Sequence, residues 1–120
     1  MGESNMFEGT VLGGSADGIE VDTPFGRLAV AGTAEAGTRL SLCIRPEQIL
    51  ATGGEERNLV SLGELQVEEV SFFGTHHRCL GRHLESNASF IVRLPQDRVV
   101  RVGEKLHLAV KREDIVLLRH

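Results

Sequence analysis

The sequence predicts an all-β fold in which two tandem, related β units build a small barrel. Apolar residues alternate with polar ones along most of the chain, as expected for strands with one buried face. The chain has 14 glycines and 3 prolines, a composition that suits short strands joined by tight turns. No apolar pattern with a helical period continues beyond one turn.

The two units are evident from residues 40–50, whose pattern recurs 66 positions later at residues 106–116. Both copies carry, at equivalent positions, a leucine pair, a β-branched residue, a base, an acid and an isoleucine. A glycine, a polar residue and a base precede each copy. We therefore expect one domain over residues 6–120, after a disordered start at 1–5, with repeat halves at about 6–50 and 58–118.

In the first half, the alternation predicts strands near residues 6–12, 19–22, 28–30 and 40–44. The Thr23-Pro24-Phe25-Gly26 segment fits a β-turn with proline at its second position. Pro46 ends the fourth strand, because proline has no N–H to donate to a sheet. We expect one-turn helices at residues 46–49 and 112–115.

Residues 51–57 resemble a linker between the halves, since they contain Gly53-Gly54 followed by two acidic residues. After this linker, strands are expected near residues 63–73, 75–84, 90–94 and 106–110, before a last apolar segment at 115–117.

The longest of these strands contains an irregularity, because its alternation slips by one position between Val67 and Val70. A one-residue slip turns every later side chain to the other face, so we expect a β-bulge at residues 68–69. Phe72 then stays in phase with the core, and Phe73 is expected to point outward.

Charge and composition argue against nucleic-acid and membrane roles. The net charge is −4, and the chain has 5 Phe but no Trp or Tyr, whereas barrels that bind single strands use basic grooves and stacking aromatics. No apolar run reaches the roughly 18 residues of a membrane span, and no secretory leader is evident. We expect a soluble intracellular domain without direct membrane insertion.

The histidines do not have the spacing of a metal site. His76 and His77 are adjacent on a strand and point to opposite faces. His77 and His83 share a face but lie about 20 Å apart along an extended strand. We expect polar-face histidines, and neither a metal nor a cofactor.

The two cysteines do not form a disulfide framework. Cys43 occupies the position of Ala109 in the repeat, where a small residue suits a tight contact. Cys79 follows His77 and Arg78, which would lower its pKa only if all three side chains converged. No catalytic residue is expected.

Arg45, Pro46 and Glu47 are candidate interface residues, because a base and an acid flank a rigid bend. They form either an ion pair that pins the bend or a contact edge toward another domain. Phe73 and Gly74 are a second candidate, since an outward phenylalanine beside a glycine suits an interface anchor.

A set of hydroxyl and basic side chains in the second half provides candidate contacts to an anionic ligand. The alternative for these residues is a solvated strand face. The set consists of Thr75, Arg78, Arg82 and Arg93.

Several segments together carry a family resemblance: Asn5-Met6-Phe7-Glu8-Gly9, residues 37–47 ending in Ile44-Arg45-Pro46-Glu47, residues 63–74 with Phe73-Gly74, Leu94-Pro95, Val102-Gly103 and Ile115-Val116-Leu117. Their order and spacing resemble the TOBE domain, the transport-associated OB-type β domain at the C-terminus of ATP-binding subunits of ABC importers. The resemblance covers about residues 5–118 and is closest to the sugar, polyamine and ferric-iron importers.

This resemblance implies an OB-like barrel that acts as a non-catalytic regulatory and dimerisation domain. Its implied partners are the ATP-binding domain, a second copy of the subunit and, indirectly, the membrane subunits. It also implies a cytoplasmic location at the inner face of the membrane. The chain departs from a whole subunit because it contains no phosphate-binding G-x-x-x-x-G-K-[ST] motif, so we expect no ATPase activity from it. The alternatives are a sensor of a small oxyanion or sugar and, less favoured by the charge, an OB-type nucleic-acid-binding domain.

Overall fold

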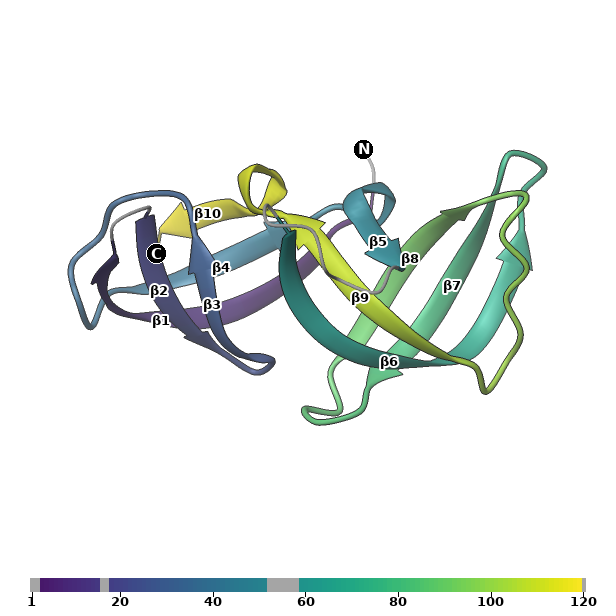
Figure 1. Ribbon diagram of the computed structural model, residues 1–120, viewed down its shortest axis with the longest axis horizontal. Coiled ribbons are helices and arrows are strands. Elements are labelled where there is room, and N and C mark those ends of the chain that lie inside the picture. The colour runs from purple at the N-terminus through teal and green to yellow at the C-terminus, as the bar shows by residue number, and fades with distance from the viewer. Residues whose placement is uncertain (1–2, 16–17, 52–58, 120) are drawn as a thin grey trace.

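A computed structural model describes residues 3–15, 18–51 and 59–119 and confirms the all-β class (Figure 1). Its elements, in chain order, are β1 (Asn5–Ser15), β2 (Gly18–Thr23), β3 (Gly26–Val30), β4 (Arg39–Ile44), the 3-10 turn η1 (Pro46–Gln48), β5 (Ile49–Ala51), β6 (Leu59–Phe72), β7 (His76–His83), β8 (Ser89–Pro95), β9 (Lys105–Lys111), the 3-10 turn η2 (Arg112–Asp114) and β10 (Val116–Arg119). The two expected one-turn helices are therefore present. Of the expected linker, residues 52–57 lie outside the described residues, and Ala51 ends β5.

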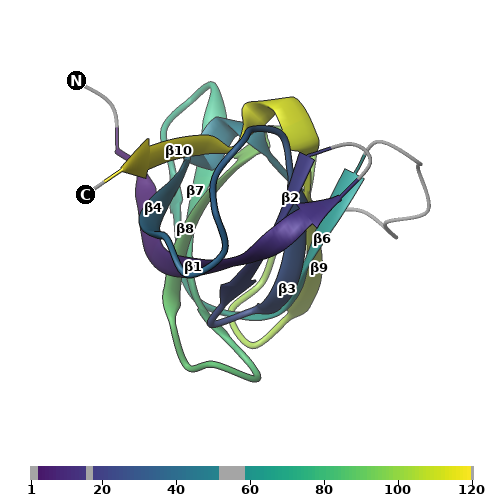
Figure 2. The ribbon, with the colours of Figure 1, turned by 90° about the vertical axis from the view of Figure 1, so that its left-hand side faces the viewer.

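The strands form two curled five-stranded sheets, which lie side by side along the long axis of a 43 × 28 × 27 Å molecule (Figure 1). The first sheet has the order β10-β4-β1-β2-β3 and the second the order β5-β9-β6-β7-β8. Seen along the long axis, the strands curve around the interior (Figure 2). This arrangement confirms the predicted OB-like fold built from two related units.

The last short strand of each unit is exchanged between the sheets. β5 follows the first unit but pairs with β9, as in the register Ile49↔Val110. β10 follows the second unit but pairs with β4, as in the register Val116↔Cys43. Each sheet is therefore completed by a strand of the other unit, which joins the two units into one body.

The turns that precede the repeated strands are also equivalent. In the first unit, the Val11 N–H donates to the Thr38 carbonyl oxygen and the Gly37 N–H donates to the Val11 carbonyl oxygen. In the second unit, Val67 takes the place of Val11 in the same two bonds, with Glu104 and Gly103 as its partners. The repeat read from the sequence thus extends to individual hydrogen bonds.

Both units contain a β-bulge directly after this valine. The register shifts between Val67 and Glu69, as the sequence predicted, and also between Val11 and Gly13. Because a bulge increases the local twist of a strand, the two bulges help to curl the two sheets in the same way.

One hydrophobic core runs through both sheets, built from the alternate inward side chains of their strands. At the junction of the sheets, Phe25 of the β2–β3 turn packs edge-on against Phe7 of β1 with ring centroids 4.4 Å apart. The Phe25 ring also lies 4.8 Å from Phe90 of β8 and 4.9 Å from His83 of β7. This aromatic cluster joins the first sheet to the second.

His83 corrects the expectation of polar-face histidines, because it is 1% exposed. Its Nε2 donates to the Leu62 carbonyl oxygen at 2.7 Å, and its Nδ1 accepts from the Ser86 N–H at 3.1 Å. Both ring nitrogens therefore have partners, which satisfies the usual requirement for a buried polar group.

Phe72 is also a correction, since it is 61% exposed instead of filling the core. β9 pairs with β6 only as far as Gln66, so the end of β6 has β7 as its only neighbouring strand in the described sheet. The alternation assigned Phe72 to one face of the sheet. It could not show that β9 ends before it reaches the part of β6 that carries Phe72.

Candidate functional site

The tip of the β6–β7 hairpin is an exposed aromatic surface. Phe72 and Phe73 are 61% and 58% exposed. The ring of His77 lies 5.1 Å from that of Phe72, and the ring of His76 stacks on Phe73 at 5.4 Å. The Phe73 N–H donates to the His76 carbonyl oxygen, which closes the turn at Gly74. Two phenyl rings are thus held in water by a defined turn.

Among the described residues, this tip has no counterpart in the first unit. The β1–β2 hairpin ends at the pair Ser15↔Gly18, which corresponds in register to Ser71↔Arg78. The second hairpin continues for one more pair, Phe72↔His77, and a longer turn. The exposed aromatic residues are therefore confined to an extension that the repeat itself does not require.

The predicted interface residues Arg45, Pro46 and Glu47 lie at the bend between β4 and β5. Pro46 is buried where η1 contacts β8, and Arg45 and Glu47 are exposed. The structure describes both charged residues and places no ion pair between them. Of the two interpretations of this motif, the pinning ion pair is not observed.

Two of the four predicted anion contacts come together. Arg78 of β7 lies opposite Arg93 of β8 in the sheet register. Arg82 is instead within 3.5 Å of Glu68, and the Thr75 hydroxyl lies 2.9 Å from Nδ1 of His76. The arginine pair on β7 and β8 is the part of the predicted set that could contact one ligand.

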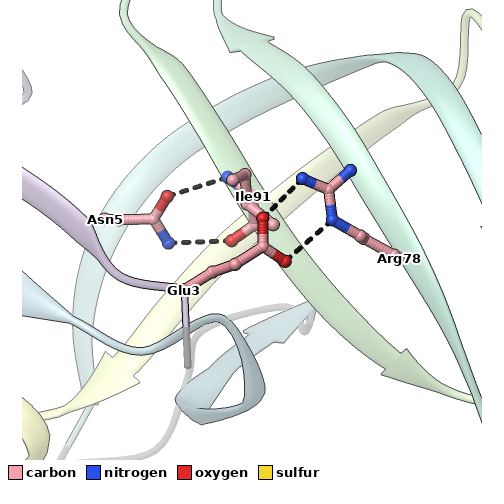
Figure 3. Close-up of polar contacts among 4 residues, drawn as sticks. All are labelled: Glu3, Asn5, Arg78 and Ile91. Atoms are coloured by element: carbon pink, nitrogen blue, oxygen red, sulfur yellow. Dashed lines mark hydrogen bonds and ion pairs between the residues drawn. The ribbon is translucent and has the colours of Figure 1, made fainter. Parts of the chain in front are cut away.

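The N-terminal residues 3–5, predicted as part of a disordered start, are held against these two strands (Figure 3). Arg78 donates from Nε to Glu3 Oε1 at 2.8 Å and from Nη2 to Glu3 Oε2 at 2.5 Å. Asn5 exchanges two hydrogen bonds of 2.8 Å with the backbone of Ile91, through its side-chain amide. The sequence held no signal of these contacts, because their partners lie 75 and 86 positions away.

The electrostatics of this contact follow from its geometry. The hydrogen bond and charge of Arg78 hold the pKa of Glu3 below its ordinary value, and the charge of Arg93 adds to this effect. The same hydrogen bond raises the pKa of Arg78. Burial raises the pKa of the Cys79 thiol, so the interpretation of Cys79 as an activated thiol is not supported.

A cleft of about 740 Å³ lies beside the arginine pair. Glu47 after β4, Leu50 of β5, His76 of β7 and Arg93 and Pro95 of β8 all contribute to its wall. The cleft thus brings one predicted interface residue and one predicted anion contact to the same surface. In the described ranges, no group of three His, Cys, Asp or Glu side chains has the arrangement of a metal site.

No helix in the described residues is long and apolar enough to cross a membrane.

The fold and the sequence were compared with those of known proteins. A solved structure with a similar fold, with a TM-score of 0.78, is the cytoplasmic molybdate-binding protein ModG in a form with molybdate bound. It shares 14% sequence identity with this chain, and the alignment covers 97% of this chain and 96% of ModG. Its likeness concerns the fold. No curated protein sequence matches the chain.

The order of the motifs along the chain resembles that of one sequence family. The characteristic pattern of the TOBE domain matches residues 42–118, which include the end of the first unit and the whole second unit. The chain therefore belongs to the TOBE domain family.

Proposed function

We propose that this TOBE domain is a non-catalytic regulatory and dimerisation domain of an ABC importer's ATP-binding subunit, of the sugar, polyamine or ferric-iron type. Its partners would be the ATP-binding domain and a second subunit, with the membrane subunits contacted indirectly. It would act in the cytoplasm, peripheral to the inner face of the membrane. Membership of the TOBE family supports this setting.

The observation that carries the pairing role is the exposed aromatic tip at Phe72 and Phe73. Large apolar side chains that are held in water by an ordered turn are typical of contact sites. The described hairpin of the first unit has no such tip, so the repeated fold does not by itself explain why the second unit has one.

The proposed mechanism is mechanical. In a two-fold dimer, the same surface of each subunit contacts its partner, so one tip can serve both sides of the contact. The domain would keep two ATP-binding domains paired while their nucleotide sites open and close. The distance between the two domains would differ between the open and closed states of the nucleotide sites. A ligand could shift the cycle only by the difference between its affinities for these two states.

Analytical ultracentrifugation of the chain at several concentrations tests the pairing. We expect the mass to rise from 13.1 kDa toward twice that value. Phe73→Ser should weaken the dimer by at least about tenfold, because burial of one phenyl ring contributes about 1.5–3 kcal/mol and each factor of ten in affinity corresponds to about 1.4 kcal/mol. The circular dichroism spectrum should not change.

Leu84→Ser is the matched control, since Leu84 is also exposed but follows the opposite end of β7. An equal loss of pairing in both variants would contradict the role of the tip. A chain that remains monomeric at every concentration would contradict dimerisation by this domain alone.

A second function, the sensing of a small oxyanion or sugar, is supported by the adjacent Arg78 and Arg93. The molybdate-bound ModG structure shows that a chain of similar fold and extent holds an oxyanion. The same centrifugation, repeated with molybdate, phosphate, sugars and polyamines, tests this function. A ligand-dependent change in mass or shape would favour the sensor over the mechanical role.

A further inference from the structure

We propose that Arg78 and Arg93 form a binding site for a small dicarboxylate, and that Glu3 of the same chain occupies part of this site as an internal ligand. This inference rests on the second proposed function, ligand sensing, and specifies its site and ligand class. It follows from the geometry of one carboxylate, one guanidinium and a second arginine on the neighbouring strand.

The bound group in the structure is itself a carboxylate. Two parallel hydrogen bonds, of 2.8 and 2.5 Å, join the Arg78 guanidinium to both oxygens of Glu3 (Figure 3). This planar two-point contact is the arrangement in which arginine recognises carboxylates most specifically. The contact with Glu3 therefore indicates that Arg78 is placed to bind the carboxylate group of a ligand.

The charges at the site do not balance with Glu3 alone. Like charges on directly opposed strand residues repel, so the Arg78–Arg93 pair requires a negative partner. Glu3 supplies one negative charge, whereas the two arginines carry two positive charges. Arg93 makes no hydrogen bond or ion pair with the residues that the structure describes. Glu69 acts on Arg78 through its charge, and Glu47 and Asp97 line the same cleft as Arg93, but none of these carboxylates bonds to either arginine. The Arg93 guanidinium therefore remains available to a second acidic group.

A free ligand can displace Glu3, because the ion pair lies at the surface, with the Arg78 and Glu3 side chains 30% and 40% exposed. Exposed ion pairs contribute little net stability, since water and salt compete with them. A short tether still gives Glu3 an effective concentration in about the millimolar range, so the free ligand must exceed this local competition. A dicarboxylate can compete with Glu3 because it contacts both arginines, whereas Glu3 bonds only to Arg78.

The site also opens toward space that a ligand could enter. Arg93 lines the cleft of about 740 Å³, together with Leu94 and Pro95 of β8. His76 is on the same wall. A ligand held by Arg78 and Arg93 would thus extend into an existing cavity.

Removal of the internal ligand is the direct test. Malonate is titrated into the wild type and Glu3→Ala, with the ¹⁵N resonance of the Arg78 Nε–H group followed by NMR. We expect malonate to bind Glu3→Ala about three- to tenfold more tightly than the wild type. Glu3→Ala combined with Arg93→Gln should lose this gain.

Glu68→Ala is the matched control, because it also removes a carboxylate from an exposed ion pair on the same sheet. Its partner Arg82 lies opposite Ser89, so no second arginine stands across from it. We expect no gain in malonate binding from this variant. An equal gain in both variants would overturn the proposal, since any released arginine would then suffice.

Two anions of different shape test the ligand class. Acetate offers one carboxylate and sulfate is tetrahedral, so both should bind Glu3→Ala more weakly than malonate does. Sulfate binding as tight as that of malonate would overturn the dicarboxylate assignment. An unchanged Arg78 resonance in Glu3→Ala at every malonate concentration would overturn the site itself.

The proposed sensing function can fail separately. If malonate does not bind but molybdate or a sugar shifts other resonances of the wild type, the site is wrong and the sensor remains. If no anion or sugar shifts any resonance, both proposals are contradicted.

Discussion

The Asn5 side chain pairs with the Ile91 backbone as if it were one more strand beside β8. The Asn5 Nδ2 donates to the Ile91 carbonyl oxygen, and the Ile91 N–H donates to Asn5 Oδ1, both at 2.8 Å (Figure 3). β8 is the last strand of the second sheet, whereas Asn5 begins β1 of the first. One amide therefore satisfies part of an open sheet edge and links the two sheets.

Loss of the Asn5 side-chain amide should be costly for the substitution of a single polar residue. Asn5 is 5% exposed, and its substitution leaves the Ile91 N–H and carbonyl group without their partner. We expect Asn5→Ala to lower the free energy of unfolding by about 1–3 kcal/mol, the usual effect of an unsatisfied buried group. Urea unfolding measures this change, and faster hydrogen exchange of the Ile91 amide locates it.

Gln66→Ala provides the control, because Gln66 carries the same kind of amide on an exposed strand position. It should change the stability by no more than about 0.5 kcal/mol. Slow exchange of the Ile91 amide in Asn5→Ala would mean that this hydrogen-bond pair does not protect the edge.

Gly63 lies against the buried ring of His83, which leaves no room for a side chain at position 63. Gly63 has a φ of 90°, and a Cβ atom at this position would lie 2.6 Å from Nε2 of the buried His83 ring. The ring cannot move away without loss of its bond to the Leu62 carbonyl oxygen. We expect Gly63→Ala to destabilise the fold by more than about 3 kcal/mol, which thermal or urea unfolding would detect.

Gly74→Ala separates the two causes of this effect. Gly74 also has a positive φ, of 83°, but no heavy atom lies within 4 Å of its added Cβ. Backbone strain alone should therefore cost about 1–2 kcal/mol at this position. If both alanine variants lose the same stability, the contact with His83 is not the reason that Gly63 is required.

The parts of the fold that the sequence predicted depend on local pattern. The one-turn helices and the bulge after Val67 each follow from residues within a few positions of one another. The repeat follows from the comparison of two such local patterns 66 positions apart. Strand alternation and proline positions encode such features directly. Even the equivalent bulge after Val11 could have been inferred from the repeat.

The rest of the site depends on which strands become neighbours. Alternation assigned Phe72 to a face but could not show that β9 stops short of it. The same limit applies to His83, whose buried ring packs against Phe25 of the other sheet. The Glu3–Arg78 contact joins residues 75 positions apart, and no periodicity in the sequence relates them.

The Glu3–Arg78 contact should depend on pH in the acidic range. The pKa of Glu3 in the folded chain lies below its ordinary value of 4.5, because Arg78 stabilises the charged carboxylate. A lowered pKa gives a contribution to stability that is present above the ordinary value and is lost as the pH falls through the folded value. The stability difference between the wild type and Glu3→Gln should thus be constant near neutral pH, decrease as the pH falls below 4.5, and vanish once the pH is below the folded pKa.

Unfolding in urea at a series of pH values, at low salt, would measure this difference. High salt should reduce it at every pH, because both side chains are partly exposed. A difference that grows as the pH falls would have the wrong sign and would contradict the ion pair.

The two thiols should differ in reactivity for a reason that the sequence did not reveal. Arg78 precedes Cys79, but its guanidinium is engaged by Glu3 on the outer face, while the Cys79 side chain is buried in the core. Burial raises the pKa of this thiol, so little of the reactive thiolate forms near neutral pH. Cys43 is half-buried and accessible to reagents.

We expect iodoacetamide to label Cys43 in the folded chain and Cys79 only after unfolding, as peptide mass spectrometry would show. In Cys43→Ser, labelling should be absent until urea is added, and rapid labelling without urea would mean that the strand bearing Cys79 opens in the native state.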